Sequence, residues 1–146
     1  MGTGKGEVKI RKMTEADLQS VKGIDKELAG PYRYVSWPVR VEAHWWVHRG
    51  MPSFVAEIEG EVVGFVLGDI RGTDYATDMC AWIDMMGVSP KHQCKGIGGM
   101  LVGAFCQECQ KRKVKVKVVL IEDDKRLVKF WKSIGFQKGN LVNYEK

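Results

Sequence analysis

A glycine-rich turn is the segment of this 146-residue chain best suited to chemistry. It reads Val-Ser-Pro-Lys-His-Gln-Cys-Lys-Gly-Ile-Gly-Gly over residues 88–99, between an apolar run typical of a buried strand and a stretch with helical periodicity. The first turn of a helix presents free backbone N–H groups and the positive end of the helix dipole, and glycines let a phosphate approach them without meeting a Cβ. The turn therefore indicates a pyrophosphate cradle. The alternative is a turn that only packs the helix against the strand.

Two other phosphate-binding motifs do not fit the sequence. The GxGxxG fingerprint of dinucleotide-binding folds lacks its spacing here and its downstream acid after a second strand. The P-loop pattern GxxxxGK[ST] is absent both from this turn and from the glycines of residues 2–6.

Two motifs resemble those of the GNAT N-acetyltransferases. Val-x-Pro followed by Gln93-x-x-Gly96-x-Gly98 is similar to that family's motif A, [RQ]-x-x-G-x-[GA], and residues 129–136, KFWKSIGF, resemble its later F-Y-x-x-x-G-F signature. The resemblance covers nearly the whole chain, and its strong part is residues 88–105. It implies an α/β fold with a mixed, splayed β-sheet flanked by about four α-helices, in one domain spanning residues 1–146.

The same resemblance implies acetyl-CoA as cosubstrate, lying between the strand that ends at Val88 and a strand over residues 114–121. Backbone N–H groups of the turn would hold the pyrophosphate, and the edge at Met86 and Val88 would pair with pantetheine amides, freed by a bulge at Gly87. The N–H of Met86 would stabilise the oxyanion as an amine attacks the thioester. The acetyl group would pass directly to a primary amine of a small molecule, protein or peptide. The implied cofactor-binding residues are Met86, Val88, Gln93, Cys94, Lys95, Gly96, Ile97 and Gly98.

Asp84 is the candidate general base. Alternation along the strand predicts that it shares a face with Met86, and burial on an apolar strand would raise its pKa into a useful range. The alternative is a structural acid paired with a cation. Glu122, at the end of the next strand, is a weaker candidate, and Asp124 stands where many family members have an asparagine near the cofactor.

The position of the family's usual general acid holds a different residue in this chain. The signature has a tyrosine where this chain has Trp131, and an indole N–H donates hydrogen bonds without acting as an acid near neutral pH. Tyr144, Cys80 or a bound water could supply the proton, or the thiolate could leave unassisted. This substitution keeps a second function open, a CoA-binding module with little or no catalysis.

Other polar and aromatic residues are candidates for the site that binds the acceptor amine. His44 and His48 are four residues apart on one predicted helix; HWWVH lacks the glutamate of HExxH, so we expect no metal and place both beside the substrate cleft. Tyr32, Tyr34, Trp37, Trp45 and Trp46 fall in the region that the family uses for the acceptor, although some could be core residues. The CxxC of residues 106–109 has no second pair, which favours buried thiols.

Cys94 lies inside the proposed phosphate loop, just before a helix N-terminus and between two lysines. The helix dipole and the charges of Lys91 and Lys95 favour a thiolate there. We therefore expect Cys94 to be reactive when CoA is absent.

The elements that must position these residues follow from apolar periodicity and from glycine and proline breaks. Glu59-Gly60 predicts a tight hairpin, and Gly135 the C-terminal cap of a helix. The expected strands are residues 8–11, 53–58, 61–70, 79–88 and 114–121, and another from 136. The expected helices are residues 14–28, 38–49, 96–112 and 123–134.

Composition narrows the classes of protein and partner. With 45% apolar and 28% charged residues the chain should fold, and its longest charge-free stretch, residues 96–107, is too short for a membrane span. No secretory segment precedes the fold, so we expect a cytoplasmic protein with reduced cysteines. Residues 91–117 carry a net charge of +6 and the rest of the chain −1, which fits a cofactor-phosphate patch and a helix end better than a nucleic-acid surface. The resemblance also allows a homodimer.

Overall fold

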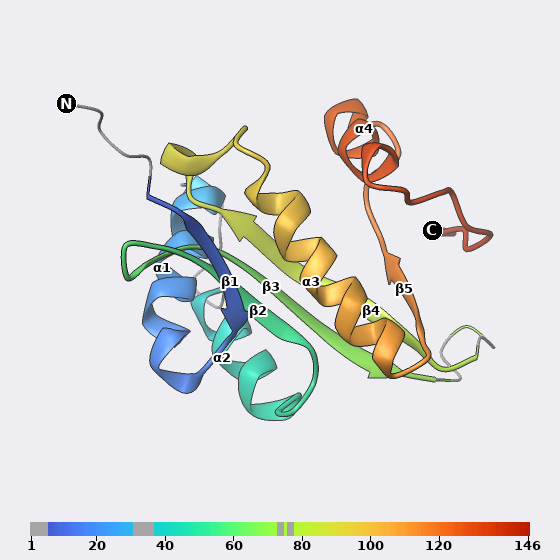
Figure 1. The fold of residues 1–146 in the computed structure, drawn as a ribbon. Coiled ribbons are helices and arrows are strands. Elements are labelled where there is room, and N and C mark those ends of the chain that lie inside the picture. The colour runs from blue at the N-terminus through green and yellow to red at the C-terminus, as the bar shows by residue number, and fades with distance from the viewer. Residues whose placement is uncertain (1–5, 31–36, 73–74, 76–77) are drawn as a thin grey trace.

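A five-stranded mixed β-sheet forms the centre of the computed structural model, which describes residues 6–30, 37–72, 75 and 78–146. Its strands lie side by side in chain order; the first four are antiparallel to their neighbours, whereas the last runs parallel to the fourth (Figure 1). The expected mixed α/β fold is confirmed. The strands are β1 (Val8–Lys12), β2 (Ser53–Ile58), β3 (Glu61–Arg71), β4 (Cys80–Val88) and β5 (Lys115–Val118).

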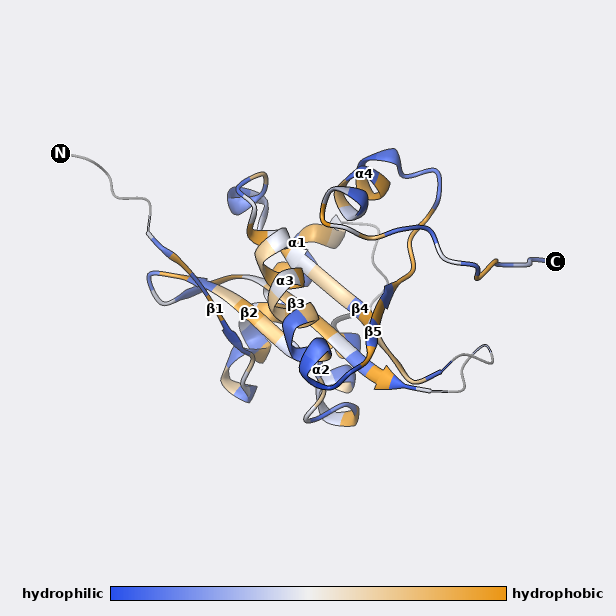
Figure 2. Cartoon of the chain, turned by 45° about the vertical axis from the view of Figure 1, so that its right-hand side comes forward, coloured by the Kyte–Doolittle hydropathy of each residue, from blue (hydrophilic) through white to orange (hydrophobic). Residues whose placement is uncertain are grey.

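Helices cover both faces of the sheet. The helices α1 (Leu18–Ala29) and α2 (Trp37–Val47) pack on one face, and α3 (Ile97–Lys111) and α4 (Lys125–Ser133) on the other (Figure 1). Each face has its own hydrophobic core, so the central strands are apolar on both sides, as their continuous hydrophobic runs predict (Figure 2). No helix in the described part of the chain has the length and apolar character needed to cross a membrane.

Two glycines allow helices to approach the sheet closely. A Cβ on Gly68 of β3 would lie 2.3 Å from the ring of Phe105, and a Cβ on Gly87 of β4 would lie 2.4 Å from Leu28 Cδ1. Both distances are below any real contact, so α3 and α1 pack against these strands only because the side chains are absent.

The sheet opens between β4 and β5. Residues 80–83 of β4 pair with residues 115–118 of β5, whereas residues 84–88 have no described strand beside them on that side. After Val118 the chain leaves the sheet and leads into α4 (Figure 1). This separation is the splay that the sequence predicted, and it leaves one edge of β4 free from Asp84 to Val88.

The bulge in β4 lies at Asp84, not at Gly87 as predicted. Residues 67 and 68 of β3 pair with Met85 and Ile83 respectively, so Asp84 has no partner residue on β3. Gly87 keeps its place in the ladder, and its glycine is required by helix packing instead. A bulge adds one residue to one strand and bends it, here where β4 also parts from β5.

The bulge also changes which side chains share a face. Ile83 and Met86 pack with the core under α3, whereas Met85 packs with the core under α1 and α2 and Asp84 contacts His44 of α2. The prediction that Asp84 and Met86 face the same way is therefore wrong, because the extra residue interrupts the strict alternation of a regular strand.

Most predicted element ends lie close to the observed ones, but two predicted strands differ. Glu59 and Gly60 both have positive φ, as a tight hairpin turn requires, and Gly135 has φ +95° after α4. Residues from Phe136 onward form no strand, and β5 ends at Val118 rather than continuing to residue 121. The tail after Phe136 is almost wholly exposed, so it has no apolar face to pack against the sheet.

Candidate active site

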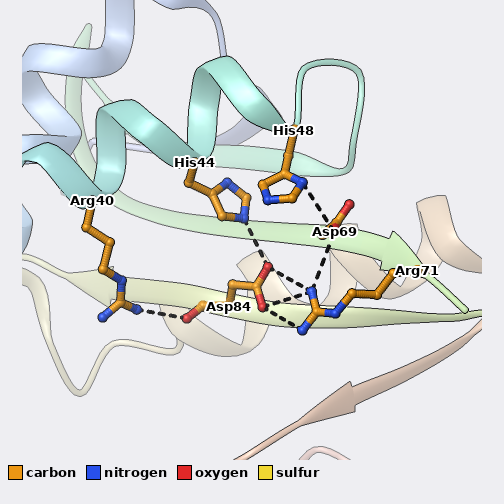
Figure 3. Close-up of polar contacts among 6 residues, drawn as sticks. All are labelled: Arg40, His44, His48, Asp69, Arg71 and Asp84. Atoms are coloured by element: carbon orange, nitrogen blue, oxygen red, sulfur yellow. Dashed lines mark hydrogen bonds and ion pairs between the residues drawn. The ribbon is translucent and has the colours of Figure 1, made fainter. Parts of the chain in front are cut away.

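A cluster of two histidines, two aspartates and an arginine lies between α2 and the sheet (Figure 3). His44 Nε2 is 3.0 Å from Asp84 Oδ2, and His48 Nδ1 is 3.2 Å from Asp69 Oδ2. Arg71 joins the two pairs, with Nη1 3.4 Å from Asp84 and 3.5 Å from Asp69. The two histidine rings are tilted by 45° to one another, with centroids 4.5 Å apart. These five residues are called the His–Asp cluster below.

Simple periodicities bring these residues together. His48 directly follows α2, and its N–H donates to the His44 carbonyl oxygen at 2.9 Å, so the four-residue spacing places both histidines on one side of the helix. The two-residue spacing of Asp69 and Arg71 places both on the same face of β3. The bulge turns Asp84 toward them. Sequence reasoning identified the histidines and Asp84 but missed Asp69 and Arg71, for which the only signal was polar alternation at the end of an apolar strand.

Arg40 of α2 fixes the bulge through the backbone. Its Nη2 donates to the carbonyl oxygen of Asp84 at 3.1 Å (Figure 3). A bulged residue leaves the strand ladder, so its backbone groups need other partners. This hydrogen bond supplies one and ties α2 to the point where the sheet splays.

The pKa of Asp84 is lowered, contrary to the prediction that it is raised. Burial does act to raise it, but the hydrogen bond from His44 and the positive charge of Arg71 together outweigh that effect. Asp84 is therefore ionised near neutral pH, as in the alternative of a paired acid. Taken by itself, an acid of lowered pKa is a weak general base.

The glycine-rich turn follows the free edge of β4. Gln93 Nε2 donates to the carbonyl oxygen of Val88 at 3.0 Å, and Cys94 and Gly96 have φ +61° and +80°. α3 begins at Ile97, with its first bond from Met100 N to the carbonyl oxygen of Gly96. The N–H groups at the start of α3 thus have no intrahelical partner, as an anion site requires.

The side chains around this turn divide between solvent and core. Lys91, Cys94 and Lys95 are exposed, whereas Ile97 is 1% exposed and can offer a ligand only its backbone. A Cβ on Gly98 would lie 3.4 Å from the Phe130 ring, an ordinary contact. The packing of α4 beside α3 therefore does not require a glycine at this position.

Of the remaining predicted acids and bases, Cys80 lies opposite Arg71 of the His–Asp cluster in the β3–β4 ladder, and the other three have different surroundings. Glu122 is exposed and pairs with Lys138 at 2.6 Å, and Asp124 caps α4 by accepting from Leu127 N at 3.1 Å. Tyr144 is 92% exposed in the C-terminal tail, and the structure does not bring it to Asp84. Cys80 is buried in β4.

Trp131 is a core residue. It is 6% exposed and makes edge-on ring contacts with Phe130 and Phe136. This packing explains a large apolar side chain at the position of the family's tyrosine. The thiol of Cys109 is buried, as predicted, and that of Cys106 is half-buried; burial raises the pKa of Cys109 to about 11.

The predicted aromatic cluster is only partly described. Trp45 packs against the core under α1 and α2, whereas Trp46 is exposed and lies under Arg49. Tyr32, Tyr34 and the side chain of Trp37 lie outside the described residues. A shallow hollow of about 500 Å³ lies elsewhere, along the lysine-rich side of α4, and none of the His–Asp cluster lines it.

Solved structures with the same fold are acetyltransferases. The complex of AAC(6')-Iy with the bisubstrate analogue CoA-S-monomethyl-acetylneamine has a TM-score of 0.77 at 18% identity, covering 96% of this chain and 98% of that one. A possible acetyltransferase from Clostridium difficile 630 has a TM-score of 0.80 at 18% identity, covering 95% of this chain and 96% of that one. Ribosomal-protein-alanine N-acetyltransferase from Brucella melitensis biovar Abortus 2308 has a TM-score of 0.75 at 16% identity, covering 95% of this chain and 98% of that one.

The sequence comparisons address the family directly. No curated protein sequence matches the chain. The model of the acetyltransferase (GNAT) family matches residues 21–136, a range that includes the His–Asp cluster, the free edge of β4 and the glycine-rich turn. Fold, turn and family model agree, and the chain belongs to the GNAT acetyltransferase family.

Proposed function

We propose that this protein transfers the acetyl group of acetyl-CoA directly to a primary amine of a small molecule, protein or peptide. The observation that carries the proposal is that three features follow one another from β4 to the start of α3. Asp84 of the His–Asp cluster begins the unpaired edge of β4, this edge ends at Val88, and the glycine-rich turn then starts α3 with free N–H groups.

Acetyl-CoA supplies an activated thioester, and the chain supplies its binding groups. The proposed phosphate contacts are the backbone N–H groups of residues 93–98, with Lys91 and Lys95 as nearby cations. The free edge at Met86 and Val88 is proposed to hydrogen-bond the pantetheine amides, with the N–H of Met86 directed at the developing oxyanion. The relatives crystallised with CoA or a CoA analogue support this choice of cosubstrate.

An acceptor amine is protonated near neutral pH and must lose a proton before it attacks. Asp84 alone is too acidic for this task, but its Oδ2 lies 3.0 Å from His44 Nε2, and a neutral imidazole can act as a general base. We therefore assign proton removal to the pair of His44 and Asp84, in which Asp84 orients and stabilises the imidazole. General-base catalysis of this kind contributes roughly 10²- to 10⁴-fold.

The departing thiolate needs a proton, and the geometry of the His–Asp cluster assigns this role of general acid to none of its residues. Tyr144 stays a prediction, since its exposure of 92% means that nothing in the described part of the chain holds it at the reacting atoms. A Tyr144→Phe variant measures its contribution to kcat directly.

A CoA-binding module with little catalysis is the second candidate, and Trp131 is the observation that favours it. The family's tyrosine is replaced by a side chain that is buried in the core and cannot donate a proton near neutral pH. Catalysis, if it occurs, must then proceed without that acid.

One experiment separates the two functions. Acetyl-CoA binding is measured by calorimetry, and CoA release is followed with small amines, polyamines and peptide N-termini. The enzyme binds acetyl-CoA and releases CoA only when an amine is present, whereas the module binds without turnover across the panel. Absence of acetyl-CoA binding would contradict both.

The cellular setting follows as a further part of the proposal. All four cysteines are free thiols, which suits the reducing cytoplasm that we propose as the compartment. A homodimer and the absence of nucleic-acid binding stay predictions.

A further inference from the structure

A row of three side chains crosses the sheet beside the His–Asp cluster. Asp69 of β3 lies opposite Trp82 of β4, and Trp82 lies opposite Lys117 of β5. Residues directly opposite on neighbouring strands point to the same face, so all three lie on the face that α2 partly covers. The next row, two residues away, consists of Arg71, Cys80 and Lys115 in the same way.

Two cationic side chains lie beside the ring of Trp82. Arg71 lies over its ring at 5.1 Å and Lys117 at 5.7 Å, while the Tyr75 ring is 5.9 Å away. The attraction of each cation for the aromatic ring holds two like charges near one another. The Trp82 side chain is buried, and its Nε1–H has no hydrogen-bond partner. A buried donor without a partner is uncommon and calls for an acceptor group.

The charge on this face is not balanced by the protein. Asp69 and Asp84 are engaged by Arg71 and the histidines, whereas neither Lys115 nor Lys117 forms an ion pair with a carboxylate in the described ranges. This patch, which consists of Arg71, Trp82, Lys115 and Lys117, therefore carries positive charge that an anionic ligand would neutralise.

The position of the patch separates it from the phosphates of CoA. Trp82 precedes Val88 by six residues, a span of about 20 Å along a strand. The glycine-rich turn lies beyond Val88, at the other end of β4. The patch instead adjoins Asp84, at the point where β5 leaves β4. A group bound at Trp82 thus belongs to the acceptor side of the proposed reaction.

We propose that the acceptor amine carries an anionic group, a carboxylate or a phosphate, which Lys117 binds together with Arg71 against Trp82. This inference rests on the proposed acetyltransferase function and specifies the class of its second substrate. It predicts that polycationic amines without an anionic group, such as spermidine, are poor acceptors, since the patch repels them.

The test compares amines that differ only in the anionic group. Lysine is compared with cadaverine, which lacks the carboxylate, and phosphoethanolamine with ethanolamine, which lacks the phosphate. We expect kcat/KM for CoA release to be about 10- to 100-fold higher for the anionic member of the preferred pair, as for a hydrogen bond to a charged group. The two pairs distinguish a carboxylate from a phosphate, and rising salt should reduce the preference.

Two lysine variants test whether the preference for an anionic amine depends on the patch. Lys117→Gln should reduce the preference about 10-fold or more, by lowering kcat/KM for the anionic amine. The matched control is Lys111→Gln, an exposed lysine at the end of α3, which should leave the preference unchanged. Equal or better turnover of cadaverine and ethanolamine by the wild type, or an unchanged preference in Lys117→Gln, overturns the inference.

A binding measurement keeps the inference independent of turnover. Phosphoethanolamine or lysine should change tryptophan fluorescence in the wild type, not in Trp82→Phe, and only weakly in Lys117→Gln. If acetyl-CoA binds but no amine reacts, a response to the anionic ligand still supports the patch, and its absence contradicts it. Failure of acetyl-CoA to bind is a different result and contradicts the proposed function alone.

Discussion

His44 Nε2 lies 3.0 Å from Oδ2 of Asp84, and this contact links the middle of α2 to the bulge of β4. The aspartate is ionised and the histidine is 10% exposed, so the pair is shielded from bulk water at the point where the sheet opens. The carboxylate of Asp84 holds the imidazole in place, so His44 is positioned to accept a proton from an amine, as the proposed transfer requires.

Removing either member of this pair should slow acetyl transfer. We expect His44→Gln and Asp84→Asn each to lower kcat by about 10²-fold or more, and the double variant to be little worse than either, because the two act as a unit. Acetyl-CoA affinity should be unchanged. Glu122→Gln, at an exposed carboxylate, is the control. Independent losses that multiply in the double variant would show that the residues do not act together.

Acid should weaken the fold through two aspartates. The hydrogen bond from Arg11 lowers the pKa of Asp17, and the contacts with His44 and Arg71 outweigh burial to lower that of Asp84. Each therefore contributes stability that is present above about pH 4, the ordinary pKa of an aspartate, and is lost as pH falls through the lower folded value. The difference in Tm between wild type and Asp17→Asn or Asp84→Asn should shrink between pH 6 and pH 3. A difference that stays constant over this range argues against both ion pairs.

Cys94 should be the thiol that reacts. It is exposed within the phosphate turn, whereas Cys80 and Cys109 are buried and Cys106 is half-buried. We predict that iodoacetamide inactivates the wild type, that acetyl-CoA protects it, and that Cys94→Ala is active and insensitive. The idea is wrong if the alanine variant is inactivated at the same rate. Cys94→Gly is a useful companion, because glycine accepts the φ of +61° without strain.

Gly68 should not tolerate a methyl group. A Cβ there would meet the Phe105 ring at 2.3 Å, so Gly68→Ala must displace α3, and we expect a loss of about 1–3 kcal/mol in the free energy of unfolding. Gly103→Ala in α3 has no neighbour within 4 Å and should stabilise the helix by up to about 1 kcal/mol. Denaturant unfolding of the two variants measures both effects. Similar stability of Gly68→Ala and wild type would contradict the close packing seen here.

Local chemistry explains why much of the fold was predictable. Apolar, β-rich runs identified β2, β3 and β4, and a four-residue apolar spacing identified α3, because each element buries side chains in one or both of the cores. Gly60 and Gly135 adopt the positive φ that their turns need, which sequence alone signals. The tail after Phe136 was predicted wrongly as a strand, since a strand also needs an adjacent edge and an apolar face, and these are properties of the assembled sheet.

The sequence by itself determined the strand–turn–helix unit around residues 88–99, because its glycines, its proline and its apolar periodicity all act within a few residues of one another. Only the tertiary structure decided what Asp84 does. Its bulge, its face and its lowered pKa depend on Arg71 and on His44, which is 40 residues away in the chain. Side-chain electrostatics depend on distances of a few ångströms between elements, and no local pattern encodes them.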